Sequence, residues 1–133
     1  MNPVETVQQI YAAFGRGDIP FILAQLADDV DWEHDNVAPV PWLQPLKGRA
    51  QVPRFFDVLM TNVEITEFVP TFFGAQGDTV VSLVNLKFTV RATGRQVVEP
   101  DEVHIWRFNP AGQVQRFRHR ADTWQSVQAL QKG

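Results

Sequence analysis

The sequence of 133 residues contains no cysteine, which excludes disulfide bonds, thiol nucleophiles and thiolate metal ligands. It has no apolar run near the roughly 20 residues that a bilayer-spanning helix needs. The first residues also lack the basic and apolar regions of a signal peptide, so we expect a cytoplasmic protein with no membrane partner. Lys and Arg form no run and the net charge is -3, so nucleic acid is not an expected partner.

Motifs of several enzyme classes are also missing. No glycine-rich phosphate loop follows a predicted strand, and no Gly-x-Ser-x-Gly nucleophile turn occurs. The usual signatures of redox cofactors and of covalent acyl transfer are therefore absent. No compact set of metal ligands occurs either, although His34, Glu102, His104 and Asp122 could form one by converging in space. We expect no cofactor and no metal.

The composition that remains is that of one globular domain spanning residues 1–133. Hydrophobic residues make up 44% of the chain and charged residues 20%, which is a normal balance for a folded protein. The chain has ten Phe and four Trp. So many rings indicate either a thick core or an apolar ligand cavity lined by aromatic side chains.

Apolar residues at helical spacing predict three helices in the first half of the chain, over residues 2–15, 18–26 and 48–60. Pro53 moves the start of the third regular helix to residue 51 or 52, because proline is tolerated only in a first turn. Residues 30–34 alternate with period 2 and predict a short strand. The proline-rich residues 35–47 then form a loop, which either packs on the surface or closes over an apolar opening as a lid.

The second half has the character of a sheet. Long strands and a final helix are expected over residues 63–73, 79–91, 96–108, 113–122 and 123–132, respectively. Pro70 indicates an edge strand or a bulge, and Pro100 interrupts another strand. We therefore predict an α+β fold in which a strongly curved, mainly antiparallel sheet wraps over three N-terminal helices as a cone with a hydrophobic pocket.

The strand pair around an Asn-Pro-Ala-Gly turn is rich in chemistry. Glu102, His104 and Trp106 share one face of the first strand, because alternate side chains of a strand point the same way. Arg116, Arg118, Arg120 and Asp122 share one face of the second strand. If both sets face inward, a histidine, two acids and several arginines converge beside an indole ring.

Short motifs along nearly the whole chain occur in a characteristic order. They are residues 7–14 followed by Gly17 and Asp18, residues 26–33, residues 48–50 before Phe55 and Phe56, residues 104–108, and Asp122. Together they resemble SnoaL-like (polyketide-cyclase-like) and ketosteroid-isomerase-like proteins of the nuclear-transport-factor-two-like (NTF2-like) superfamily. The resemblance implies a deep pocket in each cone, a homodimer formed through the outer face of the sheet, and inward-pointing His34, His104 and Asp122. It also implies that no metal is bound.

The chain departs from the best-known enzymes that it resembles. Steroid isomerases have a tyrosine where this chain has Ile10, a catalytic aspartate where it has His34, and a second aspartate where it has His104, so we do not expect steroid isomerisation. Asp122 and Arg118 resemble part of the Asp-Arg-Asp group of limonene-epoxide-hydrolase-like proteins, but the second Arg-x-Asp pair is missing. Polyketide cyclases keep one late acid, here Asp122, and scytalone-dehydratase-like proteins use two histidines and an acid.

Three residues are the predicted catalytic groups. His104 is the expected base or polariser because an unperturbed histidine titrates near pH 6.5; alternatively it is a core histidine held by Glu102 or a backbone carbonyl. His34 ends a strand beside the proline-rich loop and is either part of the site or an exposed loop residue. Asp122 is either the complementary acid or the cap of the final helix.

Eight further side chains are expected to contact a ligand: Trp32, Trp42, Phe55, Phe56, Glu102, Trp106, Arg118 and Arg120. The rings could equally be ordinary core. Arg118 or Arg120 could orient an acid or hold a substrate carboxylate with two hydrogen bonds. The alternative for the arginines is a solvated or dimer-interface stripe, which we favour for Arg116.

The expected ligand is a small, hydrophobic, partly oxygenated molecule. We expect a cofactor-free enzyme that isomerises, cyclises or dehydrates this molecule by proton transfer in an aromatic pocket. The alternative is a non-catalytic ligand-binding or dimerisation module, because the fold serves both kinds of protein.

Overall fold

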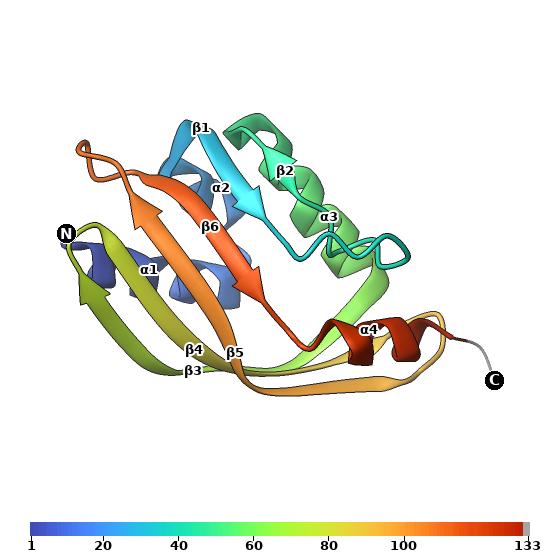
Figure 1. Cartoon of the computed structure of the whole chain (residues 1–133). Helices are drawn as coiled ribbons and strands as arrows, with labels where there is room; N and C mark the ends of the chain where they lie inside the picture. Colours follow the sequence, from blue (N-terminus) through green and yellow to red (C-terminus); the bar gives the residue numbers. More distant parts are fainter. Residues whose placement is uncertain (132–133) are drawn as a thin grey trace.

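A strongly curved sheet bends around the helices in the computed structural model of the protein, which describes residues 1–131 (Figure 1). The six strands follow the order β2-β1-β6-β5-β4-β3. The elements are α1 (Pro3–Gly15), α2 (Ile19–Ala24), β1 (Leu26–Glu33), β2 (Leu46–Lys47), the 3-10 turn η1 (Arg49–Gln51), α3 (Val52–Asn62), β3 (Val63–Gln76), β4 (Thr79–Val90), β5 (Gln96–Phe108), β6 (Val114–Arg120) and α4 (Thr123–Leu130). The predicted α+β class, with three N-terminal helices and a mixed sheet, is confirmed.

Local side-chain chemistry fixes where the N-terminal helices begin. The side chain of Asn2 accepts a hydrogen bond from the backbone N–H of Glu5 at 2.8 Å, and Asp18 accepts one from Phe21 at 3.2 Å. These bonds satisfy N–H groups that have no partner within the helix. Pro53 lies in the first turn of α3, where its missing N–H is harmless, as the sequence predicts.

The sheet combines one parallel and four antiparallel strand pairs. β1 runs parallel to β6, and the remaining neighbours, including the long strands β3, β4 and β5, are antiparallel. β3 forms an edge, and its register shifts between Pro70 and Phe72, so both predictions drawn from Pro70 are confirmed. An edge strand tolerates proline because its outer N–H groups need no partner in the sheet.

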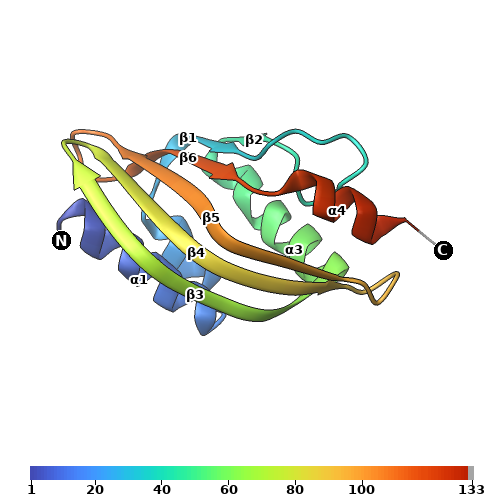
Figure 2. The same ribbon diagram turned by 60° about the horizontal axis from the view of Figure 1, so that its bottom comes forward.

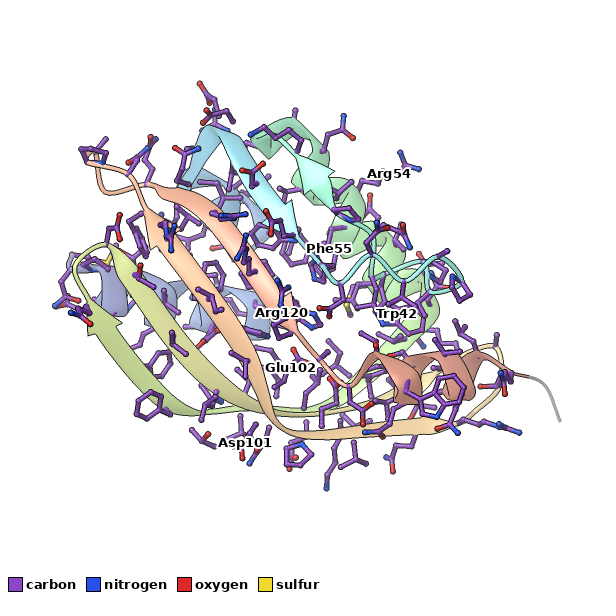
Figure 3. The ribbon with its side chains drawn as sticks, viewed as in Figure 1. Trp42, Arg54, Phe55, Asp101, Glu102 and Arg120 are labelled. Carbon is purple, nitrogen blue, oxygen red and sulfur yellow. The ribbon has the colours of Figure 1, made fainter. Side chains whose placement is uncertain are left out.

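A bulge in β5 changes which side chains face inward. The register between β4 and β5 shifts where Pro100 and Asp101 lie, and Asp101 has a positive φ of 58°. The side chain of Asn85 accepts the N–H of Asp101 at 3.1 Å. Glu99 and Glu102 are consequently both buried although three positions separate them, whereas Asp101 points away from the interior (Figure 3).

The interior contains two apolar clusters. The larger lies between α1, α2, α3 and the middle of the sheet, and includes Trp32, Phe56 and Trp106. The second includes Trp42 and Leu43 from the proline-rich loop, which pack with β4, β5 and α4 at the end of the molecule far from the N-terminus (Figure 2). The loop is therefore anchored by buried side chains.

Some boundaries differ from the sequence prediction. The second helix ends at Ala24 and β1 already begins at Leu26, so residues 26–29 extend a strand that was expected to start at residue 30. The short strand β2, which pairs with β1, was not predicted. The last helix was expected to reach Lys132, which lies outside the described residues. No helix within residues 1–131 is long and apolar enough to cross a membrane.

Candidate functional site

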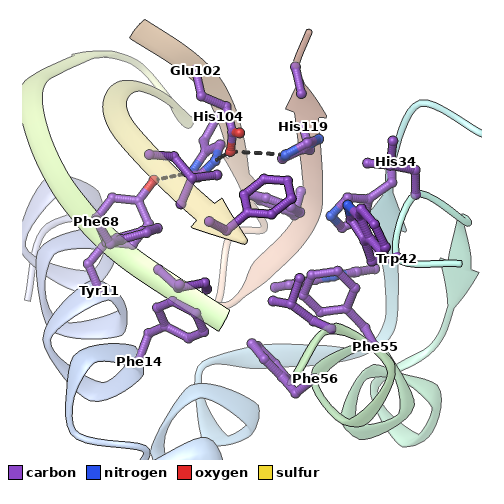
Figure 4. A pocket seen from close by; sticks show the side chains of 18 of the residues that line it. Tyr11, Phe14, His34, Trp42, Phe55, Phe56, Phe68, Glu102, His104 and His119 are labelled. Atoms are coloured by element: carbon purple, nitrogen blue, oxygen red, sulfur yellow. Dashed lines mark hydrogen bonds and ion pairs between the residues drawn. The ribbon is translucent and has the colours of Figure 1, made fainter. Parts of the chain in front are cut away.

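A pocket of about 100 Å³ lies between the helices and the inner face of the sheet (Figure 4). Eight of the predicted site residues line it: Trp32, His34, Trp42, Phe55, Phe56, Glu102, His104 and Trp106. The walls are almost entirely apolar, and the polar side chains gather at one end, where Glu102 lies between His104 and His119. Arg118, Arg120 and Asp122 do not line this pocket.

The pairing of β5 with β6 explains why the arginines are outside. His104 lies opposite His119, and Ile105 lies opposite Arg118. His119 therefore shares the inner face with His104, and Arg118 shares the outer face with Ile105. The expectation that Arg118 and Arg120 lie in the pocket was wrong, because the pairing of the two strands places His119, and not the arginines, on the inner face.

The arginines form ion pairs on the outer face instead. Arg116 and Arg118 both donate to the carboxylate of Glu33, at 2.6 and 2.8 Å. Arg120 is exposed and reaches Asp35 at 3.4 Å. The expected role of Arg118 and Arg120 as ligand contacts in the pocket is therefore contradicted, and the arginines resemble the solvated stripe of the alternative interpretation.

Asp122 is the cap of α4. Its side chain is exposed and accepts the backbone N–H of Gln125 at 3.4 Å, and its own backbone N–H donates to Glu99 at 2.6 Å. The carboxylate of Asp122 is not among the groups that line the pocket. Asp122 thus acts on the site only through its backbone.

His104 is held by partners at both ring nitrogens. Its Nδ1 lies 2.6 Å from the hydroxyl of Tyr11, and its Nε2 lies 2.7 Å from Oε1 of Glu102. Burial raises the pKa of Tyr11 and lowers the pKa of His104. A neutral His104 that accepts from Tyr11 and donates to Glu102 satisfies both bonds, while Trp106 and Ser82 complete the environment of the hydroxyl at 3.2 and 2.5 Å.

His119 connects two carboxylates. Its Nε2 lies 2.9 Å from Oε1 of Glu102, and its Nδ1 lies 3.4 Å from Asp35. Burial alone would lower the pKa of His119, but the negative charge of Glu102 and the bonds to both carboxylates raise it to about 10. At neutral pH His119 is therefore an imidazolium that donates to Glu102 on the pocket side and to Asp35 on the surface side.

Glu99 and Glu102 are held in opposite protonation states. Burial, followed by the neighbouring Glu102, raises the pKa of Glu99 to about 9. Burial opposes ionisation of Glu102 too, but His119 and His104 hold its pKa well below the usual range. The buried Oε2 of Glu102 has no N–H or hydroxyl donor within residues 1–131, so the proton of Glu99 is what can satisfy it.

His34 is a neutral ring beside the polar end of the pocket. It stacks on Phe55 with ring centroids 4.5 Å apart, and the ring of His119 lies 4.6 Å away. Burial and the charge on His119 hold the pKa of His34 well below its ordinary value. Its Nδ1 and the indole N–H of Trp32 are buried without a partner in the described part of the chain. A polar group of a ligand could meet either atom if the adjoining rings move.

Glu102, His104 and His119 also offer three potential metal-ligand atoms within 4.8 Å of one another. In a tetrahedral zinc site with bonds of about 2.1 Å, neighbouring ligand atoms lie about 3.4 Å apart. Here both histidine Nε2 atoms lie closer to the same oxygen of Glu102, at 2.7 and 2.9 Å, which are hydrogen-bond distances. The three side chains therefore fit a hydrogen-bonded network better than a metal centre.

Sequence reasoning missed several members of this network, namely Tyr11, Asp35, Ser82, Glu99 and His119. The tyrosine position of the isomerases was assigned to Ile10, whereas the hydroxyl that reaches the pocket belongs to the neighbouring Tyr11. The alternation of Phe117 with His119 was the available signal for the inner face of β6.

Comparison with known proteins identifies the family. The SnoaL-like domain model matches residues 7–117, so the chain belongs to the SnoaL-like domain family, as its motifs predict. It is similar to an NTF2-like protein of unknown function from Burkholderia pseudomallei K96243, with 31% identity, 98% of both chains covered and a TM-score of 0.86. An NTF2-like protein from Burkholderia thailandensis E264 is 27% identical over 98% of both chains, with a TM-score of 0.87.

A third solved structure contains a small molecule. TerC, co-crystallised with polyporic acid, is 26% identical to this chain, with 96% of both chains covered and a TM-score of 0.83. A search of curated proteins gave no match. The comparisons thus define the family and the NTF2-like fold, and the chemistry has to be argued from the site.

Proposed function

We propose that the protein is a cofactor-independent enzyme that moves a proton within a small, hydrophobic, oxygenated molecule, and so isomerises, cyclises or dehydrates it. The observation that carries this proposal is the placement of two buried carboxyl groups, Glu99 and Glu102, at the polar end of an apolar pocket, where their surroundings shift the two pKa values in opposite directions. Environments that push two pKa values apart provide an acid and a base at the same pH.

The proposed chemistry is proton abstraction next to a carbonyl group. When Glu99 gives its proton to the carbonyl oxygen, Oε2 of Glu102 loses that partner and takes the proton from carbon; the electrons of the C–H bond form a C=C bond, which yields an enol. In a substrate with a second C=C bond conjugated to the enol, a proton adds to the far carbon of that bond, the enol O–H returns its proton to Glu99 and the carbonyl group re-forms, which completes an isomerisation. His119 and Asp35 lead from Glu102 toward the surface and give the abstracted proton a route to solvent.

The histidines have different roles in this proposal. Both nitrogens of His104 have protein partners, so His104 orients Glu102 and is a positioning residue. His34 and Trp32 have unpartnered buried nitrogens and are the groups that would bind an oxygen of the substrate. We assign the role of the acid, which was expected for Asp122, to Glu99. The carboxyl group of Glu99 accepts a hydrogen bond from the backbone N–H of Asp122.

Two observations support a small organic ligand. The related TerC was crystallised with polyporic acid, and the pocket of this chain measures about 100 Å³. An apolar cavity of about 150 Å³ can hold a benzene ring, so one ring with modest movement of the walls is the size of ligand that suits this pocket.

Phenylacetone is a suitable probe because it combines one ring with exchangeable protons beside a carbonyl group. We expect the protein to accelerate exchange of these protons for deuterium in D₂O, measured by ¹H NMR. Glu102→Gln should lower the enzymatic rate about a hundredfold or more, the usual range for loss of a general base. Glu99→Gln should also slow the exchange, because the neutral amide is a weaker proton donor than the acid.

The matched control is Glu33→Gln, which makes the same substitution on the outer face of β1. It should leave the exchange rate unchanged. An exchange rate equal to that of buffer, although saturation-transfer NMR detects bound phenylacetone, would contradict the enzyme proposal for this ligand class. That result would favour the alternative, a ligand-binding module.

We also propose that the protein forms a homodimer through the outer face of its sheet. Val81 pairs with Ile105 and Leu83 pairs with Val103, so four half-exposed aliphatic side chains form one patch on β4 and β5. Ile105→Lys should convert a dimer into a monomer in light scattering coupled to size-exclusion chromatography. Met60→Lys, on the helical side, should leave the mass unchanged; a monomeric wild type would refute the proposal.

A further inference from the structure

A second hollow lies beside the pocket. It is a groove of about 680 Å³ between α1, α3 and the edge strand β3. Each element contributes one wall of the groove, which includes Ala12 of α1, Met60 of α3 and Phe73 of β3. α1 and β3 lie near each other in both views of the fold (Figures 1 and 2). Among the described side chains that line the groove, only Asp57 is charged.

One layer of side chains separates the groove from the pocket. Tyr11, Phe14, Phe56, Ile65 and Phe68 each line both hollows. The ring of Phe14 packs against those of Phe68 and Phe56, with centroids 5.1 and 6.0 Å apart. These rings lie on the side of the pocket away from His34 and His119 (Figure 4). Phe14 and Phe68 are only half-buried, so their rings are not enclosed on every side.

We infer that the groove is the second half of an extended binding site, which holds an uncharged, apolar tail of the molecule whose oxygenated head lies beside Glu102. Phe14 and Phe68 form the passage between the two halves. The inference rests on the proposed function for the position of the head, and it narrows the substrate class to elongated molecules with one polar end.

The sizes and charges of the two hollows support this occupant. The pocket has room for about one ring, whereas the groove is several times larger. The groove walls bury apolar groups favourably, and the negative charge of Asp57 disfavours a tail that ends in a carboxylate. The two hollows share five side chains, so a movement of these side chains changes the shape of both hollows at once.

A homologous series of ketones tests the inference: phenylacetone, 1-phenyl-2-hexanone and 1-phenyl-2-decanone. Their dissociation constants can be measured from the fluorescence of the pocket tryptophans. Each methylene group that enters the groove should tighten binding about two- to fourfold. Ala12→Trp should abolish this gain, because Ala12 is exposed and lines the groove but not the pocket. The affinity for phenylacetone should be unaffected by the substitution.

Ala111→Trp is the matched control, since Ala111 is an exposed alanine in the β5–β6 turn and lines neither hollow. It should keep the full gain with chain length. The inference is overturned if no ketone binds, if Ala12→Trp retains the gain, or if Ala12→Trp changes the oligomeric state, which would assign the groove to a second copy of the chain. A gain that Ala12→Trp abolishes, without any deuterium exchange, would support the extended site and reject the proposed catalysis.

Discussion

Replacement of His119 by alanine is expected to lower the free energy of unfolding by about 3–5 kcal/mol at neutral pH, the range for breaking a buried ion pair by removing one partner. The imidazolium neutralises Glu102, whose side chain is only 2% exposed, and Asp35, which is 15% exposed. Without His119, Glu102 must remain a buried charge with fewer donors or take up a proton. Urea unfolding monitored by tryptophan fluorescence measures the loss.

Two companion variants separate this charge effect from a simple packing defect. Arg120→Ala removes a partner of Asp35 whose side chain is 49% exposed, and it should cost less than about 1 kcal/mol. The double variant His119→Ala/Glu102→Gln should be more stable than His119→Ala alone, because it leaves no buried carboxylate at position 102. A double variant no more stable than the single one would show that the loss comes from the cavity and not from the charge.

Stability is expected to fall as the pH rises from neutrality toward 9. His119 has a pKa of about 10 in the folded protein and an ordinary value of 6.5, and Glu99 has about 9 against 4.5. Above pH 6.5 the folded state therefore holds protons that the unfolded state has lost. Each such proton lowers stability by up to about 1.4 kcal/mol per pH unit.

The opposite trend is expected in acid. Burial lowers the pKa values of His34 and His104. Below pH 6.5 the unfolded chain therefore binds protons that the folded state does not bind, and the free energy of unfolding falls. Ionised Glu102 adds to this loss below its ordinary pKa of 4.5. Glu99, which keeps its proton in the folded state, partly opposes this loss between pH 4.5 and 6.5. The stability maximum should therefore lie slightly below pH 6.5, as measured by urea unfolding between pH 5 and 9.

Glu99→Gln isolates the contribution of one group to the alkaline side of this profile. The amide cannot ionise, so the variant should lose stability less steeply than the wild type between pH 7 and 9. The stability deficit of the variant relative to the wild type should consequently be smaller at pH 9 than at pH 6. The variant becomes the more stable protein at pH 9 if the wild type has lost enough stability. An equally steep decline in both proteins would show that Glu99 does not retain its proton on folding.

Periodicity and local capping were enough to predict the architecture. The apolar stripes of the helices, the caps at Asn2 and Asp18, and the position of Pro53 all depend on residues close in sequence. The same holds for β3, where Pro70 alone indicates an edge with a bulge. The family resemblance added the order of the elements, and the aromatic side chains expected in the pocket do line it.

The polar half of the site could not be predicted in the same way, because it depends on register. Alternation shows that His104 and Trp106 share a face, but it does not say whether Arg118 or His119 lies beside them. Only the pairing of two strands decides this, and one residue of slip moves every side chain to the other face. Tyr11 was missed because it was counted only as part of the apolar stripe of the first helix, next to Ile10.

The bulge at Pro100 and Asp101 produces a residue spacing that can be recognised in other sequences. In a regular strand, two inward residues are separated by an even number of positions, whereas Glu99 and Glu102 are separated by three. Deletion of either bulge residue would leave Glu99 and Glu102 two positions apart, so both glutamates would still face inward, in a strand without the bulge. An acid, a proline directly after it and a second acid three places after the first, within a long strand of a SnoaL-like chain, therefore predict a buried carboxyl pair of this kind.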